Sequence, residues 1–394
     1  MHQAAFTQNP VNGKLSITLT EENAAYGGEC FGVIKQRTTG DNGRSYFVNI
    51  PEGKLIQRDN SGAGQNAEWP LSEFVTGVVK TQHGSMVVAT QDGILMAQPP
   101  AGTEMPEMIK LADIPGLETP ELREKSDIRI NNINVVDGIV IFGTGLKDPG
   151  KYLAKMNAQR ESSTPEYKTL ADLPKELRPA KLFMLDPRTL EVKTLKEGFC
   201  MVNSIAGHTV EDNGGKGKKT FMSYSDSATS IEQMEVAEFG KEQGLHPNPV
   251  ARRSFVGEDG RPDGTVAFMV RNPLTAHLEH RFATAMIESP RVLVLDLKLE
   301  DQGQADLPAH VTKPTMPTIE GRNDMVEFSV TTLDPGKAEG NIGGGKIYET
   351  TLNKVGQIIK PVDNIAQLSR FEDIKAAKGL ANFQPGVGRQ PQKP

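Results

Sequence analysis

Four short segments of the sequence combine oxygen-bearing or cationic side chains with glycine or with strand-like neighbours. They are 27–30 (Gly-Gly-Glu-Cys), 129–132 (Arg-Ile-Asn-Asn), 202–204 (Val-Asn-Ser) and 260–264 (Gly-Arg-Pro-Asp-Gly). Glu, Asn and Asp present oxygen donors that suit a hard cation such as Ca²⁺, Mg²⁺ or Mn²⁺, and a carboxylate-rich site also accepts Zn²⁺. Each segment also has a structural explanation, because Pro-Asp-Gly is a common turn and Asn often bonds its own backbone.

The elements that would position these segments are short strands in pairs. Apolar residues alternate with period two in short runs, and turn residues such as Asp-Gly at 92–93 and 137–138 separate the runs. The paired runs are 44–50 with 55–58, 85–90 with 94–98, 134–136 with 139–144, 181–185 with 190–195, 219–224 with 231–236, 265–270 with 291–298, and 326–331 with 346–352. The pairs recur at roughly 40–60 residues once insertions are allowed for, which is typical of propeller blades. The periodicity predicts an all-β repeat architecture and leaves the number of blades open.

Each of the four polar segments falls just before one of these hairpins. In a propeller the innermost strand of every blade starts at the axial channel. Polar residues at these strand starts would therefore converge from distant positions in the sequence.

Several stretches between or after the hairpins read differently. Residues 147–175 are polar and suit short helical turns, residues 271–290 contain apolar residues at helical spacing, and residues 301–323 are rich in Pro, Gly and polar residues. Residues 364–382 read as one amphipathic helix, and residues 384–394 are expected to be disordered.

Composition limits the classes of function. Of 394 residues only 37% are hydrophobic, while Gly (39) and Pro (26) are frequent, which suits many strands joined by tight turns. The net charge of −6 gives no electrostatic reason to bind nucleic acid or anionic membrane. Two cysteines without a CxxC pair exclude a zinc-finger signature, and neither a signal peptide nor a membrane span is indicated. We expect a cytoplasmic protein, and nothing in the sequence indicates its oligomeric state.

At the polar segments the sequence resembles the senescence marker protein/gluconolactonase/luciferin-regenerating family, which includes regucalcin. The closest likeness is Gly260–Gly264, which fits the family's GxPDG motif, and Arg129–Asn132 resembles its Arg-Phe-Asn-Asp. The other matching segments, in order, are Gly28-Glu29, Val202–Ile205, Ser223–Ser227 and Gly343–Glu349.

This resemblance implies a six-bladed β-propeller over residues 24–356, after an N-terminal extension (1–23) and before a C-terminal helix and tail (357–394). By carry-over, Glu29, Asn203 and Asp263 are the ligands of one divalent cation, Ca²⁺ first, with Zn²⁺, Mg²⁺ and Mn²⁺ as alternatives. Arg129 and Asn131 would contact a small-molecule substrate. Asp263 would also accept the proton of the attacking water.

Four residues depart from the family's pattern. Cys30 and Phe31 replace Gly-Pro after the first ligand, Asn132 replaces an Asp, and Ser204 replaces the Gly that follows the ligand Asn. The leading hypothesis is a metal-dependent hydrolase of a small lactone or ester, in which the cation polarises the carbonyl. The altered residues motivate the alternative of a non-catalytic metal- or ligand-binding propeller. A protein-binding scaffold is a third interpretation.

Histidine and cysteine residues near these segments have structural explanations. His208 follows Asn203 by five residues, and we expect it to be structural or solvent-facing. His277 and His280 would form a pair on the surface of a helix, and Cys200 would fill a buried strand.

Overall fold

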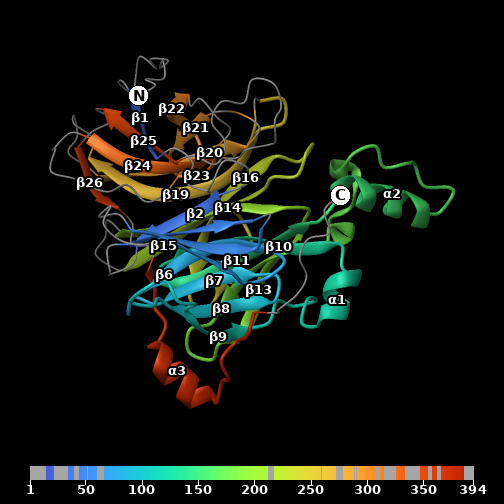
Figure 1. The fold of residues 1–394 in the computed structure, drawn as a ribbon. Coiled ribbons are helices and arrows are strands. Elements are labelled where there is room, and N and C mark those ends of the chain that lie inside the picture. Colours follow the sequence, from blue (N-terminus) through green and yellow to red (C-terminus); the bar gives the residue numbers. More distant parts are fainter. Residues whose placement is uncertain are drawn as a thin grey trace.

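The computed structural model describes residues 15–21, 34–39, 44–50, 52–59, 66–211, 217–258, 260–271, 278–287, 289, 291–306, 311–314, 325–332, 347–353, 357–361 and 365–385. In these residues the chain forms 27 strands, three α-helices and two short 3₁₀ helices, and the strands make six sheets (Figure 1). The helices are α1 (Pro120–Lys125), α2 (Pro149–Gln159) and α3 (Phe371–Lys378), and the 3₁₀ helices are Leu170–Asp172 and Lys175–Leu177.

The first three sheets follow one another along the chain. The first consists of β2 (Ile34–Thr39), β3 (Arg44–Asn49), β4 (Lys54–Asp59) and β5 (Ala67–Pro70). The second consists of β6 (Val75–Thr81), β7 (Met86–Thr90), β8 (Gly93–Gln98) and β9 (Glu107–Ala112), with β27 (Ile365–Ala366) beside β6. The third consists of β10 (Ile128–Val136), β11 (Ile139–Leu146), β12 (Ala180–Leu185) and β13 (Val192–Phe199).

The other three sheets continue the pattern. The fourth consists of β14 (Val202–Glu211), β15 (Lys218–Asp226) and β16 (Gln233–Gly240), which pairs with both β17 (Gly244–Leu245) and β18 (Ala251–Ser254). The fifth consists of β19 (Arg261–Arg271), β20 (Leu278–Ile287), β21 (Arg291–Leu295) and β22 (Asp301–Asp306), with β26 (Gln357–Pro361) beside β19. The sixth consists of β23 (Val311–Pro314), β24 (Met325–Thr332), β25 (Ile347–Asn353) and β1 (Leu15–Glu21).

One strand from each sheet takes part in a closed ring. These six inner strands contact one another in the order β2, β6, β10, β14, β19, β23 and back to β2. A ring of antiparallel sheets that radiate from a common axis is a β-propeller. The all-β propeller class predicted from the sequence is therefore confirmed.

Neighbouring sheets pack face to face, and this explains the apolar runs in the sequence. On β7, Met86 and Val88 lie in the core between the first and second sheets, whereas Val87 and Ala89 lie in the core between the second and third. Side chains alternate across a strand, so a strand covered on both faces needs apolar residues at every position. The result is the continuous run Met86–Ala89, which is fully buried.

The same constraint corrects one prediction. The segment 271–290, expected to be a helical insertion, contains the end of β19 and the strand β20, with residues 272–277 outside the described part. β20 lies between β19 and β21, and Phe282, Ala283, Ala285 and Met286 are completely buried. Its apolar residues follow no period of two because both of its faces need them, and their spacing resembles that of a helix.

The segment 147–175 does carry helical turns, as predicted. Helix α2 begins after Asp148, whose carboxylate accepts a hydrogen bond from the Lys151 N–H at 2.9 Å, and Pro149 occupies the first helical position. Both residues favour a helix start. The insertion, which also includes the 3₁₀ helix Leu170–Asp172, lies between β11 and β12 and projects from the third sheet (Figure 1).

The N-terminal and C-terminal parts of the chain contribute to the sheets. Residues 15–21, assigned from the sequence to an N-terminal extension, form β1 and pair with β25 of the sixth sheet. Strand β26 pairs with the last residues of β19, and β27 pairs with the last residues of β6. Because β6 and β19 stand three places apart in the ring, these two pairings lie on opposite sides of the axis.

The C-terminal helix is shorter than predicted. Within the range 364–382, only Phe371–Lys378 is helical, and the helix ends at Gly379, which adopts the left-handed conformation that glycine favours. Phe371 and Ile374 are buried in the core between the second and third sheets, close to β8. The helix thereby anchors the C-terminal segment to the propeller (Figure 1).

We predict that Phe371→Ala lowers the free energy of unfolding by about 3–5 kcal/mol, because it leaves a cavity in this core. Urea unfolding followed by circular dichroism would measure the change. Glu372→Ala, at an exposed position of the same helix, is the matched control and should stay within about 0.5 kcal/mol of wild type. Equal stability of Phe371→Ala and wild type would show that α3 does not stabilise the propeller.

Candidate functional site

Every inner strand carries a shift of register against the next strand of its sheet. The shifts lie at Lys35/Thr38, Val75/Gly77, Ile130/Asn132, Asn203/Ala206, Pro262/Thr265 and Val311/Lys313. Such bulges insert a residue that leaves the ladder, and they redirect side chains beside functional sites. Asn131 lies inside one bulge, Asp263 lies inside another, and Asn203 opens a third.

The amide of Asn203 joins the third and fourth sheets. Its Oδ1 accepts hydrogen bonds from Asn131 Nδ2 at 2.9 Å and from Asn132 Nδ2 at 3.2 Å, and Asn131 Nδ2 also donates to the Val202 carbonyl at 2.9 Å. None of the three Asn side chains is more than 4% exposed. Each such hydrogen bond contributes about 1 kcal/mol, whereas a buried amide left unpaired costs more. Two residues predicted from the sequence, Asn131 and Asn203, are thus in direct contact.

Arg129 lies beside this cluster. Its guanidinium carbon is 4.3 Å from the centre of the Phe74 ring, and its Nη1 donates to Asn131 Oδ1 at 3.2 Å. Burial lowers the pKa of Arg129 to about 10, and the negative charge of nearby Asp263 acts against this shift. Arg129 therefore stays charged at neutral pH, with its positive charge close to the Asp263 carboxylate.

Asp263 comes from the fifth sheet and is only 2% exposed. Its main-chain carbonyl accepts a hydrogen bond from Ser204 Oγ of the fourth sheet at 2.8 Å. The structure thus brings Arg129, Asn131, Asn203 and Asp263 together at the starts of three successive inner strands. Glu29, the remaining predicted ligand, lies outside the described residues, so its role stays a prediction.

The described residues contain no cluster of three or more His, Cys, Asp or Glu side chains that could hold a metal ion. The oxygen donors in this part of the chain come instead from two kinds of group, amides and a carboxylate. Asn132 Oδ1 is buried and has no hydrogen-bond partner among the described residues. This oxygen has no hydrogen-bond donor in the described part of the chain, its side chain contacts Asn203, and the Asp263 carboxylate lies in the same region. Such a set of buried oxygen atoms suits a hard divalent cation.

Two residues near the site were missed in the sequence. Phe74 supplies the ring under Arg129, and Thr76 is the extra residue in the bulge of β6, the place that Asn131 takes in β10. Thr76 is fully buried, and its Oγ1 has no hydrogen-bond partner in the described part of the chain. The signal that could have identified Thr76 is its position in the first hairpin strand of its sheet, which is equivalent to the position of Asn131 in the next sheet.

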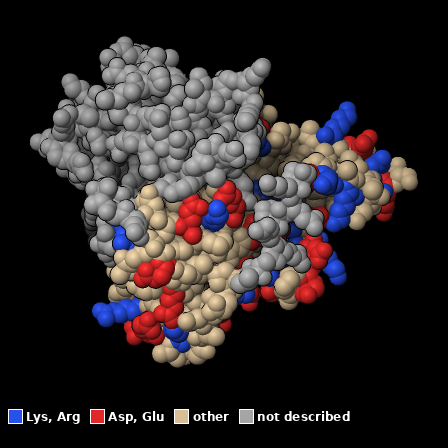
Figure 2. Space-filling model, in the orientation of Figure 1, with Lys and Arg blue, Asp and Glu red and all other residues tan. Residues whose placement is uncertain are grey.

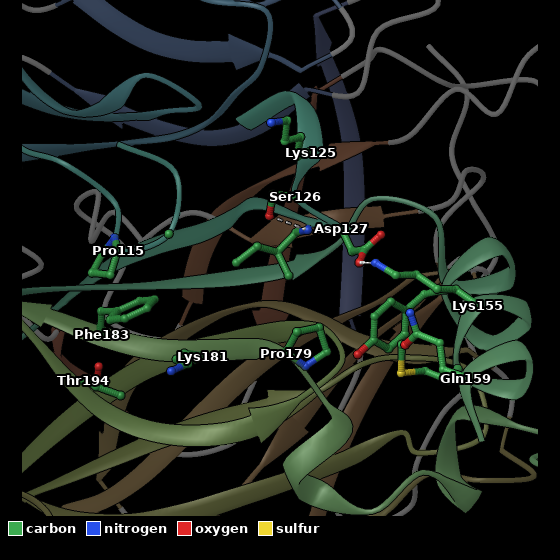
Figure 3. Close-up of a pocket in the computed structure, with 14 residues that line it drawn as sticks. Pro115, Lys125, Ser126, Asp127, Lys155, Gln159, Pro179, Lys181, Phe183 and Thr194 are labelled. Atoms are coloured by element: carbon green, nitrogen blue, oxygen red, sulfur yellow. Dashed lines mark hydrogen bonds and ion pairs between the residues drawn. The ribbon is translucent and has the colours of Figure 1, made fainter. Parts of the chain in front are cut away.

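Figure 3 shows a separate cavity of about 580 Å³. Its walls come from α2, the loop that precedes β10, and the strands β12 and β13. Lys155 from α2 and Asp127 both line it and form an ion pair at 2.5 Å. Ile128 lines this cavity, whereas the next residue, Arg129, contacts Asn131, because successive side chains of a strand point to opposite sides. The cavity and the predicted site are therefore on opposite sides of β10.

The cavity is lined by both basic and acidic side chains. Lys125 and Lys181 line it together with Lys155, and Lys181 is paired with Glu197 at 2.6 Å. Acidic and basic side chains also alternate over the described part of the face drawn in Figure 2.

The histidines take structural positions. His208 is completely buried on β14, roughly 15 Å along the strand from Asn203, and its Nε2 is 2.8 Å from the Arg281 carbonyl. Its ring centre is 4.6 Å from that of His280, which lies half-buried on β20 rather than on a helix. His277 lies outside the described residues. Cys200 is buried, and burial raises the pKa of its thiol to about 12, which excludes a nucleophilic thiolate at neutral pH.

None of the helices in the described part of the chain has the length and hydropathy needed to cross a bilayer.

Burial lowers the pKa of His208 to about 3, with the neighbouring His280 adding to the effect. The neutral ring therefore stabilises the fold above the unfolded-state pKa of about 6.5. Below that pH the unfolded chain takes up the proton first, and stability falls by about 1.4 kcal/mol per pH unit until about pH 3. We predict that wild type loses about 1.4 kcal/mol more than His208→Gln between pH 6 and pH 5, as measured by urea unfolding.

Gln at this position keeps an N–H donor for the Arg281 carbonyl and does not titrate. Parallel stability profiles for the two proteins over this pH range would contradict a buried neutral His208. His280 has its pKa lowered by burial as well, so a residual acid dependence is expected in the variant.

Comparison with known proteins adds the family to this geometry. The SMP-30/Gluconolactonase/LRE-like region matches residues 36–334 of the chain. Among solved structures, a luciferin-regenerating enzyme is similar with a TM-score of 0.59 and 15% identity, covering 86% of this chain and 96% of its own. A calcium-binding protein, regucalcin from Agrobacterium tumefaciens, is similar with a TM-score of 0.58 and 14% identity, covering 85% and 94%. No curated protein sequence shows significant similarity to this chain.

Proposed function

The chain belongs to the SMP-30/gluconolactonase/LRE-like family, and on that premise we propose that it is a divalent-metal-dependent hydrolase of a small lactone or ester. The observation that carries the proposal is the meeting of three inner strands at Arg129, Asn131, Asn203 and Asp263. Oxygen atoms that would bind the cation, a carboxylate that would accept a proton and a guanidinium that would contact the substrate lie close together there.

Asn203 and Asp263 are the described residues that would hold the cation, with Glu29 as the third ligand. Ca²⁺ is the first choice, because the structurally similar regucalcin is a calcium-binding protein and hard oxygen donors suit it. Zn²⁺, Mg²⁺ and Mn²⁺ remain alternatives. A bound divalent cation supplies positive charge that stabilises the oxyanion formed when a carbonyl is attacked.

The hydrogen bonds of Asn203 link cation binding to substrate binding. Its Oδ1 has two lone pairs, and both accept N–H groups from Asn131 and Asn132. If Asn203 Oδ1 is to hold a cation, at least one of these amides has to find another acceptor. Asn131 also bonds the Val202 carbonyl, so its amide is retained in the site and can donate to a substrate oxygen.

Arg129 would bind a hydroxyl or carboxyl oxygen of the substrate. Its pKa of about 10 keeps it charged at neutral pH, and the Phe74 ring covers one face of the guanidinium. A planar guanidinium fixed on a ring presents its N–H groups in a defined plane. Asp263 would take the proton from the attacking water.

The alternative is a propeller that binds a metal ion or ligand without turnover. One observation favours this alternative: the chain has the neutral Asn132 at a position where members of the family usually have an acidic residue. A second carboxylate is missing at that place, and Asn132 instead donates to Asn203.

The first experiment follows proton release from a panel of aldonolactones and aromatic lactones, before and after chelation and after return of single divalent ions. We expect turnover that chelation abolishes and one ion restores. A bound ion without turnover on any member of the panel would favour the binding-protein alternative.

For Asp263→Asn we predict a loss of turnover of about 10²–10⁴-fold, since Asn cannot accept the proton, together with weaker but measurable metal binding. Asp137→Asn is the control, because Asp137 lies in the turn at the other end of β10 and has a positive φ that Asn also adopts. Hydrolysis by Asp263→Asn at the rate of wild type would refute the role of the base.

For Arg129→Lys we predict that KM rises about tenfold while kcat changes less, because Lys keeps the charge but loses the fork and the stacking on Phe74. Steady-state kinetics with the best lactone of the panel would measure this. Urea unfolding provides the control: a large loss of stability would assign Arg129 a structural role instead.

A further inference from the structure

Ser204 adopts a backbone conformation that disfavours any side chain. Its φ is +55°, in the left-handed region, and the residue is fully buried. Glycine would occupy this position without strain, whereas serine is destabilising there unless other contacts compensate. A serine at this position therefore indicates that its hydroxyl makes contacts that compensate for the backbone strain.

The hydroxyl of Ser204 reaches across to the next blade. Its Oγ donates to the main-chain carbonyl of Asp263 at 2.8 Å. Because a carbonyl only accepts, the single hydroxyl hydrogen of Ser204 is committed to this bond. Ser225 Oγ, at 3.0 Å, in turn donates to Ser204 Oγ.

A third serine extends the chain of hydroxyls to the residue before Asp263. Ser227 Oγ lies 2.8 Å from Ser225 Oγ and also bonds the Pro262 carbonyl. All three serines are at most 1% exposed. Two consecutive carbonyls of β19 thereby accept hydrogen bonds from hydroxyls on β14 and directly after β15.

These two carbonyls lie where the regular pairing of β19 with β20 in the fifth sheet is interrupted. Pro262 pairs with Met286, and the ladder resumes only at Thr265 opposite Thr284. Asp263 and the residue after it therefore sit in the bulge, outside the regular pairing with β20. Hydrogen bonds from a neighbouring blade restrict the movement that this gap would otherwise permit.

We infer that Ser204 is a positioning residue that fixes the main chain at Asp263, and so sets the direction of the Asp263 carboxylate, with Ser225 and Ser227 in support. This inference rests on the proposed function for the role of the carboxylate, but the restraint on the main chain does not depend on it. Groups that orient a ligand residue typically affect metal affinity by about 10–100-fold.

The test compares Ser204→Gly with Ser204→Ala. Both lack the hydroxyl, but only Ala keeps a side chain at the positive φ, so Ser204→Ala is expected to be the less stable of the two. A positioning role predicts that both variants bind Ca²⁺ about tenfold more weakly than wild type by calorimetry. It also predicts that both show about fivefold faster amide hydrogen exchange in peptides covering 260–266, since one hydrogen bond is lost in each.

Ser85→Ala is the matched control. Ser85 is buried directly before β7 of the second sheet and donates to Gln98 Oε1 at 2.8 Å, and the second sheet stands three places in the ring from the fifth sheet, which holds Asp263. Its loss should leave both Ca²⁺ affinity and exchange at 260–266 unchanged. Ser227→Ala, which removes the bond to Pro262, should raise exchange in the same peptides without altering the φ of residue 204.

The readouts separate the inference from the proposed function. Wild-type affinity and wild-type exchange in Ser204→Gly, with defects only in Ser204→Ala, would mean that the hydroxyl does not position Asp263 and would overturn the inference. A wild-type protein that binds neither Ca²⁺ nor Mn²⁺ would overturn the proposed function, and the exchange rates of the two Ser204 variants would then decide the inference alone.

Discussion

Each of the central sheets of this propeller is covered on both faces by its neighbours, and this constraint limits where polar functional side chains can be placed. The second, third and fourth sheets have apolar cores on both faces. A charged or amide side chain in the middle of such a strand is buried, and without a hydrogen-bond or ion-pair partner inside the protein it would cost several kcal/mol. The starts of the inner strands are the places where functional side chains can gather, and the register shifts occur there in the second to fifth sheets.

The candidate site belongs to no single blade. Asn203 is held by the amides of the preceding blade, and the main chain of Asp263 is held by the serine of the blade before it. The relative placement of the blades, which their apolar cores fix, therefore also fixes the distances in the site. The charge of Arg129, close to Asp263, adds electrostatic complementarity that only this packing brings about.

Much of the propeller could be predicted from turns and alternation, because hairpins leave local signals. Asp137 and Gly138, for example, both have positive φ in the two-residue turn between β10 and β11, as an Asp-Gly hairpin requires. The site residues Arg129, Asn131, Asn203 and Asp263 could be predicted because motifs of the family mark them, and the structure brings these four together. Their chemical roles remain proposals, as does the whole of the prediction for Glu29.

What could not be predicted depends on partners distant in the sequence. The strand β20 resembled a helix because a strand buried on both faces loses its alternation. The residues at β27 were included in a helix because their pairing with β6, almost 300 positions away, leaves no local signal. Thr76 was not recognised, and Ser227 was given no role although it lies in the motif Ser223–Ser227. A buried hydroxyl in a bulge and one at a strand end resemble ordinary strand residues until the register is known.

The pairing of β1 with β25 also bears on how the protein is made. More than 300 residues separate the two strands, so β1 leaves the ribosome long before its partner exists. At roughly 5–20 residues per second this interval is on the order of tens of seconds. During that time β1 presents an unpaired edge that can join strands of other nascent chains. A chaperone that shields early segments would thus be expected to raise the yield of this protein more than that of a propeller whose blades are each completed locally.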